Sequence, residues 1–277
     1  MKFTKMHGLG NDFVFLDYFK TDLPAVDIAQ LAIKLCDRNF GVGGDGLILV
    51  LPSTKADARM RIFNSDGSEP EMCGNGVRCF AKYVYEHGIV SHNPLTVETL
   101  RGVLSLHLQV NSGIVETVRV DMGEPILKPE LVPTTGRGET VLNHPLTVDD
   151  EQVKVTAVSM GNPHCITFVD NAAAVPLEVI GPKLEKNSFF PRYTNVEFVQ
   201  VVNENEVIMR VWERGAGPTL ACGTGACATA VACVLNGKTG RKVNVRLPGG
   251  DLLVEWEADN HVYMTGPAME VFNGELK

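Results

Sequence analysis

Two short motifs place a cysteine next to two glycines. The first reads CGNG at 73–76, and the second reads CGTG at 222–225. Each cysteine precedes a segment with helical character, so we expect it to open a helix. Unpaired amides and the helix dipole at such a position favour an anion and lower the pKa of a thiol. The same amides can bind a carboxylate or phosphate without a basic side chain.

The two motifs belong to a repeat that runs through the chain. MRIFN at 60–64 matches MRVWE at 209–213, and the offset of 149 residues also relates the two motifs. The glycines that follow the predicted helices, Gly88 and Gly237, keep this offset as well. A period this long indicates two homologous domains and not a solenoid, whose repeats run about 20–50 residues. The predicted seam lies near 122–135.

Recurrence of the cysteine motif changes its interpretation. A single CGxG is best explained as a core cysteine beside helix-start glycines. A cysteine at equivalent positions of two halves instead predicts two thiols on opposite walls of one cleft. This arrangement suits a base on one face of a carbon and an acid on the other. The predicted chemistry is stereoinversion at an acidic carbon.

The sequence also predicts the elements that position these cysteines. The expected strands are 13–16, 47–51, 165–169 and 196–202, and the expected helices include 26–36 and 226–235. The second of these helices is small and apolar all round, which predicts complete burial. A further helix after Cys73 has apolar residues at one helical face: Val77, Phe80, Ala81 and Val84. Its charged residues fall elsewhere, so we expect only that face to be buried: Arg78, Lys82 and Glu86.

Composition narrows the function classes. The chain has 277 residues, 44% of them hydrophobic, and a formal net charge of −8. These values indicate a globular protein and disfavour nucleic acid and anionic membranes as partners. The N-terminus lacks the apolar core of a secretory signal, so we expect a cytoplasmic protein. The uncharged stretch 215–237 is too rich in glycine and threonine to predict a membrane span.

The cysteine motifs, MHGLGNDF at 6–13 and GNPH at 161–164 resemble diaminopimelate epimerases over essentially the full chain. The resemblance implies a pyridoxal-independent isomerase that interconverts LL- and meso-2,6-diaminopimelate in lysine and peptidoglycan precursor biosynthesis. One cysteine, as a thiolate, would remove the α-proton, and the other, as a thiol, would deliver a proton to the opposite face. The roles would exchange with direction. No cofactor and no metal are implied.

The resemblance also implies the fold and assembly. It predicts an α+β fold of two pseudo-symmetric homologous domains, each a mostly antiparallel sheet curled around a central helix. The first domain would cover 1–125 and be completed by a strand at about 268–277, and the second would cover 126–267. The active site would lie in the cleft between the domains. The family further implies a homodimer.

Motif matching assigns the site residues. Cys73 and Cys222 would be the catalytic pair, and His164 and Glu213 would tune the two thiols. The substrate-binding residues would be Asn11, Asn64, Gly74, Asn75, Asn162, Asn195, Glu213, Arg214, Gly223 and Thr224. Arg214 suits a carboxylate because its guanidinium can donate two parallel hydrogen bonds. Taken singly, the asparagines would be turn residues.

Two positions depart from the family pattern. Gly46 stands where many relatives carry Gln and where the second half has Asn195, so one substrate contact is expected to be absent. Phe272 stands where relatives often have a Tyr associated with the dimer contact.

Three other functions compete with this interpretation. Proline racemases and hydroxyproline epimerases share the paired thiols and the repeat, so only the substrate pocket separates them from this chain. GVGGDG at 41–46 matches the dinucleotide-binding pattern, but a helix is expected before it and a strand after it, the reverse of what that mechanism needs. A zinc or redox protein is disfavoured because the seven cysteines contain no C-x-x-C pair.

Overall fold

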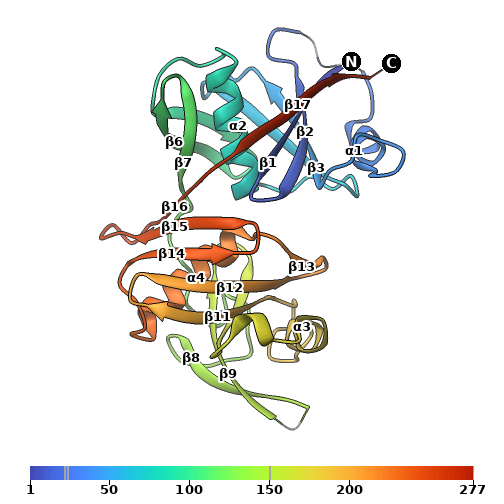
Figure 1. The fold of residues 1–277 in the computed structure, drawn as a ribbon. Helices are drawn as coiled ribbons and strands as arrows, with labels where there is room; N and C mark the ends of the chain where they lie inside the picture. The colour runs from blue at the N-terminus through green and yellow to red at the C-terminus, as the bar shows by residue number, and fades with distance from the viewer. Residues whose placement is uncertain (22, 24, 150, 277) are drawn as a thin grey trace. The chain divides into compact units, whose positions relative to one another are not determined.

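The computed structural model describes residues 1–21, 23, 25–149 and 151–276. These residues form a mixed α/β fold with 17 strands and four α-helices. The chain divides into two compact units, each of which is described by itself (Figure 1). Unit 1 comprises Met1–Asp121 and Thr265–Lys277, and unit 2 comprises Met122–Met264. Residue 277, the end of the predicted last strand, lies outside the described residues.

Unit 1 is built from strands at both ends of the chain. Its two helices are α1 (Ile28–Cys36) and α2 (Gly74–Glu86). Its strands are β1 (Lys2–Gly8), β2 (Asn11–Asp17), β3 (Gly46–Leu51), β4 (Ala58–Asn64), β5 (Leu95–Thr99), β6 (Gly102–Asn111), β7 (Ile114–Asp121) and β17 (Met269–Glu275). The last strand of the chain, β17, pairs antiparallel with the first.

Unit 2 contains the remaining elements. Its helices are α3 (Leu177–Glu185), α4 (Gly223–Leu235) and the short 3₁₀ helix η1 (Ala172–Ala174). Its strands are β8 (Val141–Val148), β9 (Glu151–Ser159), β10 (Pro163–Phe168), β11 (Asn195–Asn203), β12 (Glu206–Glu213), β13 (Gly217–Thr219), β14 (Lys242–Leu247), β15 (Gly250–Trp256) and β16 (Val262–Gly266), the last of which runs two residues past the unit boundary.

The order and direction of strand pairing repeat between the units. In unit 1, β2 and β3 are parallel, β3 and β4 antiparallel, β4 and β5 parallel, and β5 and β6 antiparallel. In unit 2, β10, β11, β12, β14 and β15 pair in the same succession of directions. The registers agree too, because Phe13 lies opposite Gly46 and His164 lies opposite Asn195. The 149-residue sequence repeat is therefore also a repeat of strand pairing, with parallel pairs inside otherwise antiparallel sheets.

The helix that follows each motif cysteine lies against many strands of its own unit. In unit 1, α2 contacts β1 to β4, β6, β7 and β17, and in unit 2, α4 contacts β9 to β12, β14 and β15. The apolar helix α4 is buried from Ala226 to Cys233, as its composition predicted, whereas Val234 and Leu235 at its end are partly exposed. The prediction of a single buried face for α2 is wrong, because every residue from Gly74 to Val84 is buried.

Hydrogen bonds explain how α2 buries its charges. The Arg78 side chain is fully buried and donates to Gly74 O (3.2 Å), Asn75 Oδ1 (2.9 Å) and Pro267 O (3.2 Å). Lys82 Nζ donates to Glu86 Oε1 (2.7 Å) and to the backbone of β7. Charged groups can be buried when they are paired and hydrogen-bonded. Helical spacing alone does not reveal such partners.

The C-terminal ends of the helices agree with the sequence predictions more closely than their N-terminal starts do. Cys73 and Cys222 are the N-caps of α2 and α4, which confirms that each opens a helix, although α4 begins at Gly223 and not at Ala226. The helix predicted from residue 26 begins at Ile28, because the Asp27 carboxylate caps it by accepting from Ala29 N and Gln30 N. Beyond α2 and α4, the glycines at 88 and 237 have φ of 66° and 64°, as expected for C-terminal stops.

The glycine-rich segment 41–46 lies between α1 and β3. A helix precedes it and a strand follows, as predicted, so it lacks the strand-to-helix context of a dinucleotide-binding turn.

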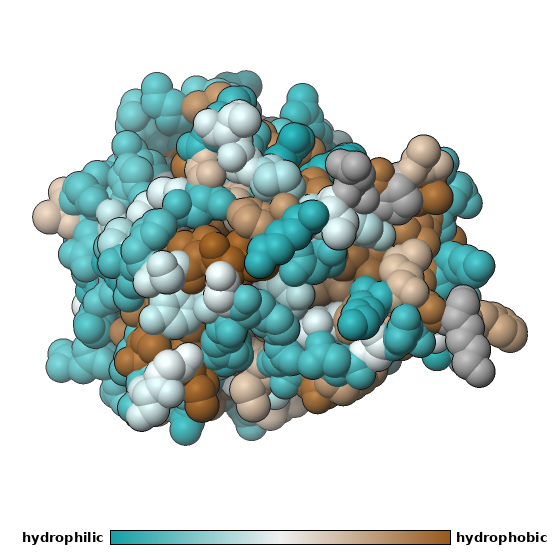
Figure 2. All heavy atoms as spheres, turned by 90° about the horizontal axis from the view of Figure 1, so that it is seen from above, coloured by the Kyte–Doolittle hydropathy of each residue, from teal (hydrophilic) through white to brown (hydrophobic). Residues whose placement is uncertain are grey.

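The surface and the helix lengths bear on partners. The face shown in Figure 2 is mostly hydrophilic, with apolar side chains grouped in small areas. Among the helices of the described residues, none is long and apolar enough to span a membrane.

Candidate active site

Cys73 forms one half-site, in unit 1. Its backbone is extended (φ −133°, ψ 120°), and its Sγ accepts a hydrogen bond from Gly76 N (3.4 Å) in the first turn of α2. The thiol also donates to Asn11 Oδ1 (3.7 Å) at the start of β2. The residue is partly exposed. We call Cys73, Asn11 and Asn75 the Cys73 half-site, because Asn75 Nδ2 donates to the same oxygen (3.2 Å).

The glycine-rich segment orients Asn11. Asn11 Nδ2 donates to Asp45 Oδ2 (2.7 Å), and Asp45 also accepts from Asp12 N (3.0 Å) and from Arg38 Nη2 (2.8 Å). Asp45 was not predicted as a site residue. Its only sequence signal is its place in GVGGDG, which matches the dinucleotide-binding pattern but lacks the strand-to-helix context.

Asp12 is a second carboxylate of this network. Its oxygens bind Arg38 Nη2 (2.7 Å) and Lys5 Nζ (2.5 Å). Burial opposes ionisation, but hydrogen bonds from Arg38 and Lys5 outweigh it and lower the pKa of Asp12 to about 2. The Asp12 carboxylate is therefore ionised at neutral pH, and its ion pairs with Lys5 and Arg38 help to fix the turn that carries Asn11.

Cys222 forms a second half-site, in unit 2. Its backbone is extended (φ −122°, ψ 108°), and Sγ accepts from Gly225 N (3.4 Å) in the first turn of α4. Thr224 Oγ1 lies 3.6 Å from the sulfur. The residue is only 5% exposed. The geometry at the helix start is thus the same as at Cys73, but the surroundings are more buried.

The pKa of Cys222 contradicts the expectation that a helix N-terminus lowers it. Burial raises the pKa of this thiol well above its usual value, and the charges of Glu213 and Glu197 raise it further. Hydrogen bonds from Thr224 and Gly225 lower it but do not compensate. Desolvation and two nearby carboxylates outweigh the dipole of one helix turn. In this state Cys222 is a protonated thiol at neutral pH.

A chain of side chains leads from Cys222 to a buried carboxylate. Asn162 Nδ2 donates to Thr224 Oγ1 (3.2 Å), and Asn162 Oδ1 lies 3.0 Å from His164 Nε2. The other nitrogen, His164 Nδ1, lies 2.6 Å from Glu197 Oε1. Both members of the His164–Glu197 pair are fully buried. Glu197 was missed, since a glutamate inside a strand resembles any charged strand residue.

Glu213 and Arg214 lie at the end of β12. Burial raises the pKa of Glu213, although a hydrogen bond from Thr219 Oγ1 (2.5 Å) and the charge of His164 act in the opposite direction. Glu213 also hydrogen-bonds Cys222. Arg214 Nη1 donates to Arg192 O (3.1 Å), and the Arg214 backbone N donates to Asn195 Oδ1 (2.9 Å).

Asn195 is buried, and both ends of its amide are used. Besides accepting from Arg214 N, it donates to Pro163 O (2.9 Å). It therefore ties the strand ends that carry Asn162, His164 and Arg214 together, and a direct contact of its side chain with substrate remains a prediction.

The positions in unit 1 that correspond to Asn195 and Glu213 carry smaller or uncharged residues. Gly46 corresponds to Asn195, and a Cβ at this position would lie 2.7 Å from Phe63 O, so a longer side chain would require the backbone to shift. Asn64 corresponds to Glu213, and its Nδ2 donates to Ser68 Oγ (2.9 Å). It thus places an amide where unit 2 has a carboxylate.

The other five cysteines are buried thiols: Cys36, Cys79, Cys165, Cys227 and Cys233. Burial raises the pKa of Cys79 and of Cys233 to about 12. Within the described part of the chain, no group of three or more His, Cys, Asp or Glu side chains is arranged to hold a metal ion.

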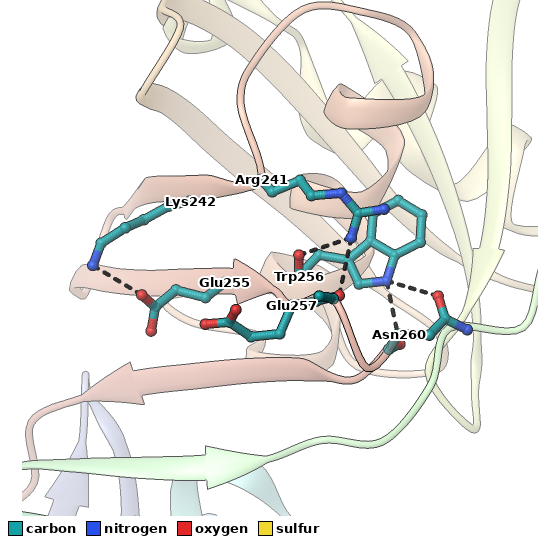
Figure 3. Close-up of a pocket in the computed structure, with 7 residues that line it drawn as sticks. Arg241, Lys242, Glu255, Trp256, Glu257 and Asn260 are labelled. Carbon is teal, nitrogen blue, oxygen red and sulfur yellow. Dashed lines mark hydrogen bonds and ion pairs between the residues drawn. The ribbon is translucent and has the colours of Figure 1, made fainter.

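A surface cavity of about 620 Å³ lies elsewhere in unit 2 (Figure 3). The Arg241 guanidinium lies over the Trp256 ring at 4.2 Å and donates to the backbone of Trp256 and Glu257. Trp256 Nε1 donates to Asn260, and Lys242 pairs with Glu255. Neither motif cysteine lines the cavity.

Solved structures identify the fold class. A PhzF-family phenazine biosynthesis protein from Bacillus anthracis superimposes with a TM-score of 0.71 at 19% identity, covering 100% of this chain and 99% of that one. A hydroxyproline epimerase from Agrobacterium vitis superimposes with a TM-score of 0.69 at 15% identity, covering 100% and 90%. The chain is thus an α/β protein of the fold that these proteins share.

Sequence comparison is more specific. The family model for diaminopimelate epimerase matches residues 3–128 and 156–271. The diaminopimelate epimerase of Desulfitobacterium hafniense is 63% identical over 100% of this chain and 98% of its own length. That of Methanococcus maripaludis strain C5 is 52% identical over 100% and 99%. The chain belongs to the diaminopimelate epimerase family.

Proposed function

We propose that this chain is an isomerase of lysine biosynthesis that epimerises diaminopimelate, and that Cys73 and Cys222 are its acid–base pair. The assignment of this activity rests on full-length similarity to curated diaminopimelate epimerases. The observation that supports the two residues is their shared position: each is the N-cap of the helix that lies against the strands of its unit. In this proposal the units are homologous halves, and each contributes one cysteine to the reaction.

The protonation state of Cys222 suggests which cysteine is the acid and which is the base. Because burial raises the pKa of the Cys222 thiol, we assign the acid to Cys222 and the base to Cys73, which must first lose the proton that it donates to Asn11 Oδ1. The Cys73 thiolate would break the Cα–H bond and take the proton, while Cys222 delivers its own proton to the opposite face of the carbanion. One C–H bond breaks and one forms, so the enzyme ends with the proton on Cys73 and runs the reverse reaction from that state. No cofactor enters this scheme.

The rest of both half-sites would bind the zwitterionic ends of the substrate. Amides after each cysteine, from Gly74 and Gly223 onward, suit the α-carboxylate, on which negative charge develops as the proton leaves. Asn11, Asn75 and Asn162 supply neutral donors and acceptors held by the contacts described above. Arg214 would bind the distal carboxylate.

Proton NMR of LL-diaminopimelate in heavy water tests the proposal. Wild-type protein without added cofactor should exchange the α-proton and form the meso isomer. Cys73→Ala and Cys222→Ala should each lower turnover by about 10³-fold, as expected for loss of a general acid or base. The matched controls Cys79→Ala and Cys233→Ala remove buried thiols from the same two helices and should keep most activity.

The assay also separates the competing substrates. L-proline and trans-4-hydroxy-L-proline should show no exchange. Near-normal epimerisation by either motif mutant would sink the two-base mechanism, and exchange of proline in place of diaminopimelate would replace the substrate.

A further inference from the structure

A buried glutamate lies directly beneath the start of the Cys222 helix. Glu197, on β11, is fully buried, and its Oε1 contacts His164 Nδ1. A Cβ on Gly225 would lie 2.7 Å from that oxygen, so the carboxylate packs against the first turn of α4. Among the described residues, no hydrogen-bond partner reaches Glu197 Oε2. Such burial of an ionisable group is costly and calls for a compensating role.

The repeat shows that the fold does not need this pair. The offset of 149 places Ile48 at the position of Glu197, and the strand register places Phe13 at that of His164. A Cβ on Gly76 would meet Ile48 Cδ1 at 3.1 Å, just as one on Gly225 would meet the glutamate. Unit 1 thus fills the space under its cysteine helix with hydrocarbon, where unit 2 has an ionisable pair.

The contacts connect the pair to the sulfur. Since a carboxylate only accepts hydrogen bonds, Glu197 requires the proton of His164 on Nδ1. The opposite nitrogen, Nε2, lies 3.0 Å from Asn162 Oδ1, which also only accepts, so this contact needs a second proton on Nε2. Asn162 Nδ2 in turn donates to Thr224, whose hydroxyl lies beside Cys222. The buried carboxylate can therefore set the orientation of every group in this chain.

We propose that Glu197 is a positioning residue that acts through His164, and that it makes the two catalytic thiols unequal by fixing the groups around Cys222 alone. This inference rests on the proposed function only in treating Cys222 as catalytic. Glu197 is not expected to touch the substrate, because it is covered by α4 and fully buried.

Electrostatics around Cys222 agree with this arrangement. After burial, the largest cause, the charges of Glu213 and Glu197 both raise the pKa of Cys222. The titratable groups that face Glu197 are His164 and Cys165 on β10, Glu213 on β12 and Cys222 on α4. Removing the Glu197 charge should thus ease loss of the Cys222 proton, whereas Cys73 should not respond.

Alkylation rates measure how easily Cys222 and Cys73 lose their protons, without any assay of turnover. Wild type and Glu197→Gln are treated with iodoacetamide across pH 6–10, and modification of Cys73 and Cys222 is quantified by peptide mass spectrometry. At pH 8, Cys222 of the variant should react at least about 3-fold faster than in wild type, with its profile moved to lower pH. The Cys73 profile is the internal control and should be unchanged. Identical Cys222 profiles in the two proteins would overturn the proposal.

A second readout is the protonation of the two imidazole nitrogens. ¹⁵N NMR should show protons on both Nδ1 and Nε2 of His164 in wild type, because each faces an oxygen that only accepts, and a different nitrogen pattern in Glu197→Gln. Epimerase assays should show kcat reduced about 10-fold or more with a smaller change in KM, and Glu197→Asp should recover part of the loss. A wild-type pattern with Nδ1 unprotonated would refute the proposed contact.

A double variant that carries the unit 1 residues tests the proposal in a protein that is expected to fold. The double change His164→Phe and Glu197→Ile reproduces the Phe13 and Ile48 arrangement and should fold, with a circular dichroism spectrum like that of wild type. Its Cys222 profile should also move to lower pH, because the same charge is absent. If this folded variant keeps the wild-type profile, Glu197 does not act on Cys222. Because alkylation needs no substrate, that result is distinct from a failure of the Cys73→Ala and Cys222→Ala tests.

Discussion

Cys73 and Cys222 share a backbone conformation and a hydrogen bond from the amide three residues later, yet their neighbours differ. Cys73 faces the amide of Asn11, whereas Cys222 lies near two carboxylates. A reaction that starts from one thiolate and one thiol needs such a difference, because identical sites would share the proton equally. At the scale of single residues, the different neighbours of the two repeat-related cysteines provide the unequal protonation that the proposed reaction needs.

The Asp12 network leads to a prediction about acid stability. The pKa of Asp12 is lowered from 3.8 to about 2, so its carboxylate stabilises the fold above about pH 4, and this contribution is lost as pH falls through 2. Between pH 5 and pH 2, wild type should therefore lose about 2 kcal/mol more unfolding free energy than Asp12→Asn. Urea denaturation at several pH values measures this difference. The exposed Asp170→Asn variant serves as control and should follow wild type, and equal slopes for Asp12→Asn and wild type would contradict the expectation.

Residue types and spacing were enough to identify the two cysteines as helix starts, because a repeated motif needs no tertiary information. The residues that hold the site were not accessible in this way. Asp45 and Glu197 act through partners far along the chain, Asn11 and His164. Their roles come from strand register, which a single sequence does not specify.

At the scale of elements, α2 and α4 show why the apolar composition of α4 predicted its burial whereas the helical periodicity of α2 did not. The uniformly apolar α4 has no polar group to satisfy, so burial follows from composition. In α2, Arg78 ties the first helical turn to the backbone at Pro267, in the segment leading to β17. The charged face is buried because a distant part of the chain supplies acceptors.

The helix α3 positions the turn that carries Arg214, which gives a second prediction. Its Glu185 is 5% exposed and accepts from Trp212 Nε1 (2.8 Å) and Gly215 N (2.9 Å). Glu185→Ala removes both bonds, so the Arg214 turn should lose its fixed geometry. KM for diaminopimelate should rise about 10-fold, the equivalent of one net hydrogen bond, with a smaller fall in kcat.

Steady-state kinetics with Glu178→Ala as the matched control test this role of α3, since Glu178 is an exposed residue of its first turn. An unchanged KM in a folded Glu185→Ala protein would show that α3 does not position Arg214.

At the scale of the whole molecule, the repeat predicted two related halves and the structure shows the same succession of strand pairings in both units. The last strand of the chain belongs to the unit that contains the first strand, because β17 pairs with β1. No local pattern indicates this, because the pairing joins residues more than 260 positions apart.

The exposed face of β17 leads to a prediction about assembly. Met269, Val271 and Phe272 are each about half exposed, and Phe272 packs edge-on against Phe3 with ring centroids 6.0 Å apart. If this face carries the homodimer expected for the family, wild type should sediment as a dimer at micromolar concentration. Phe272→Asp should weaken the dimer by at least about 100-fold, since a charge replaces roughly 3 kcal/mol of apolar burial on each chain.

Sedimentation velocity of the two proteins over a range of concentrations measures this effect. Val179→Asp, which changes an equally exposed apolar side chain on α3, is the control and should remain dimeric. A Phe272→Asp protein that stays dimeric would move the interface away from β17. A wild type that is monomeric at all concentrations would instead show that a single chain carries out the reaction, and the apolar face of β17 would then need another explanation.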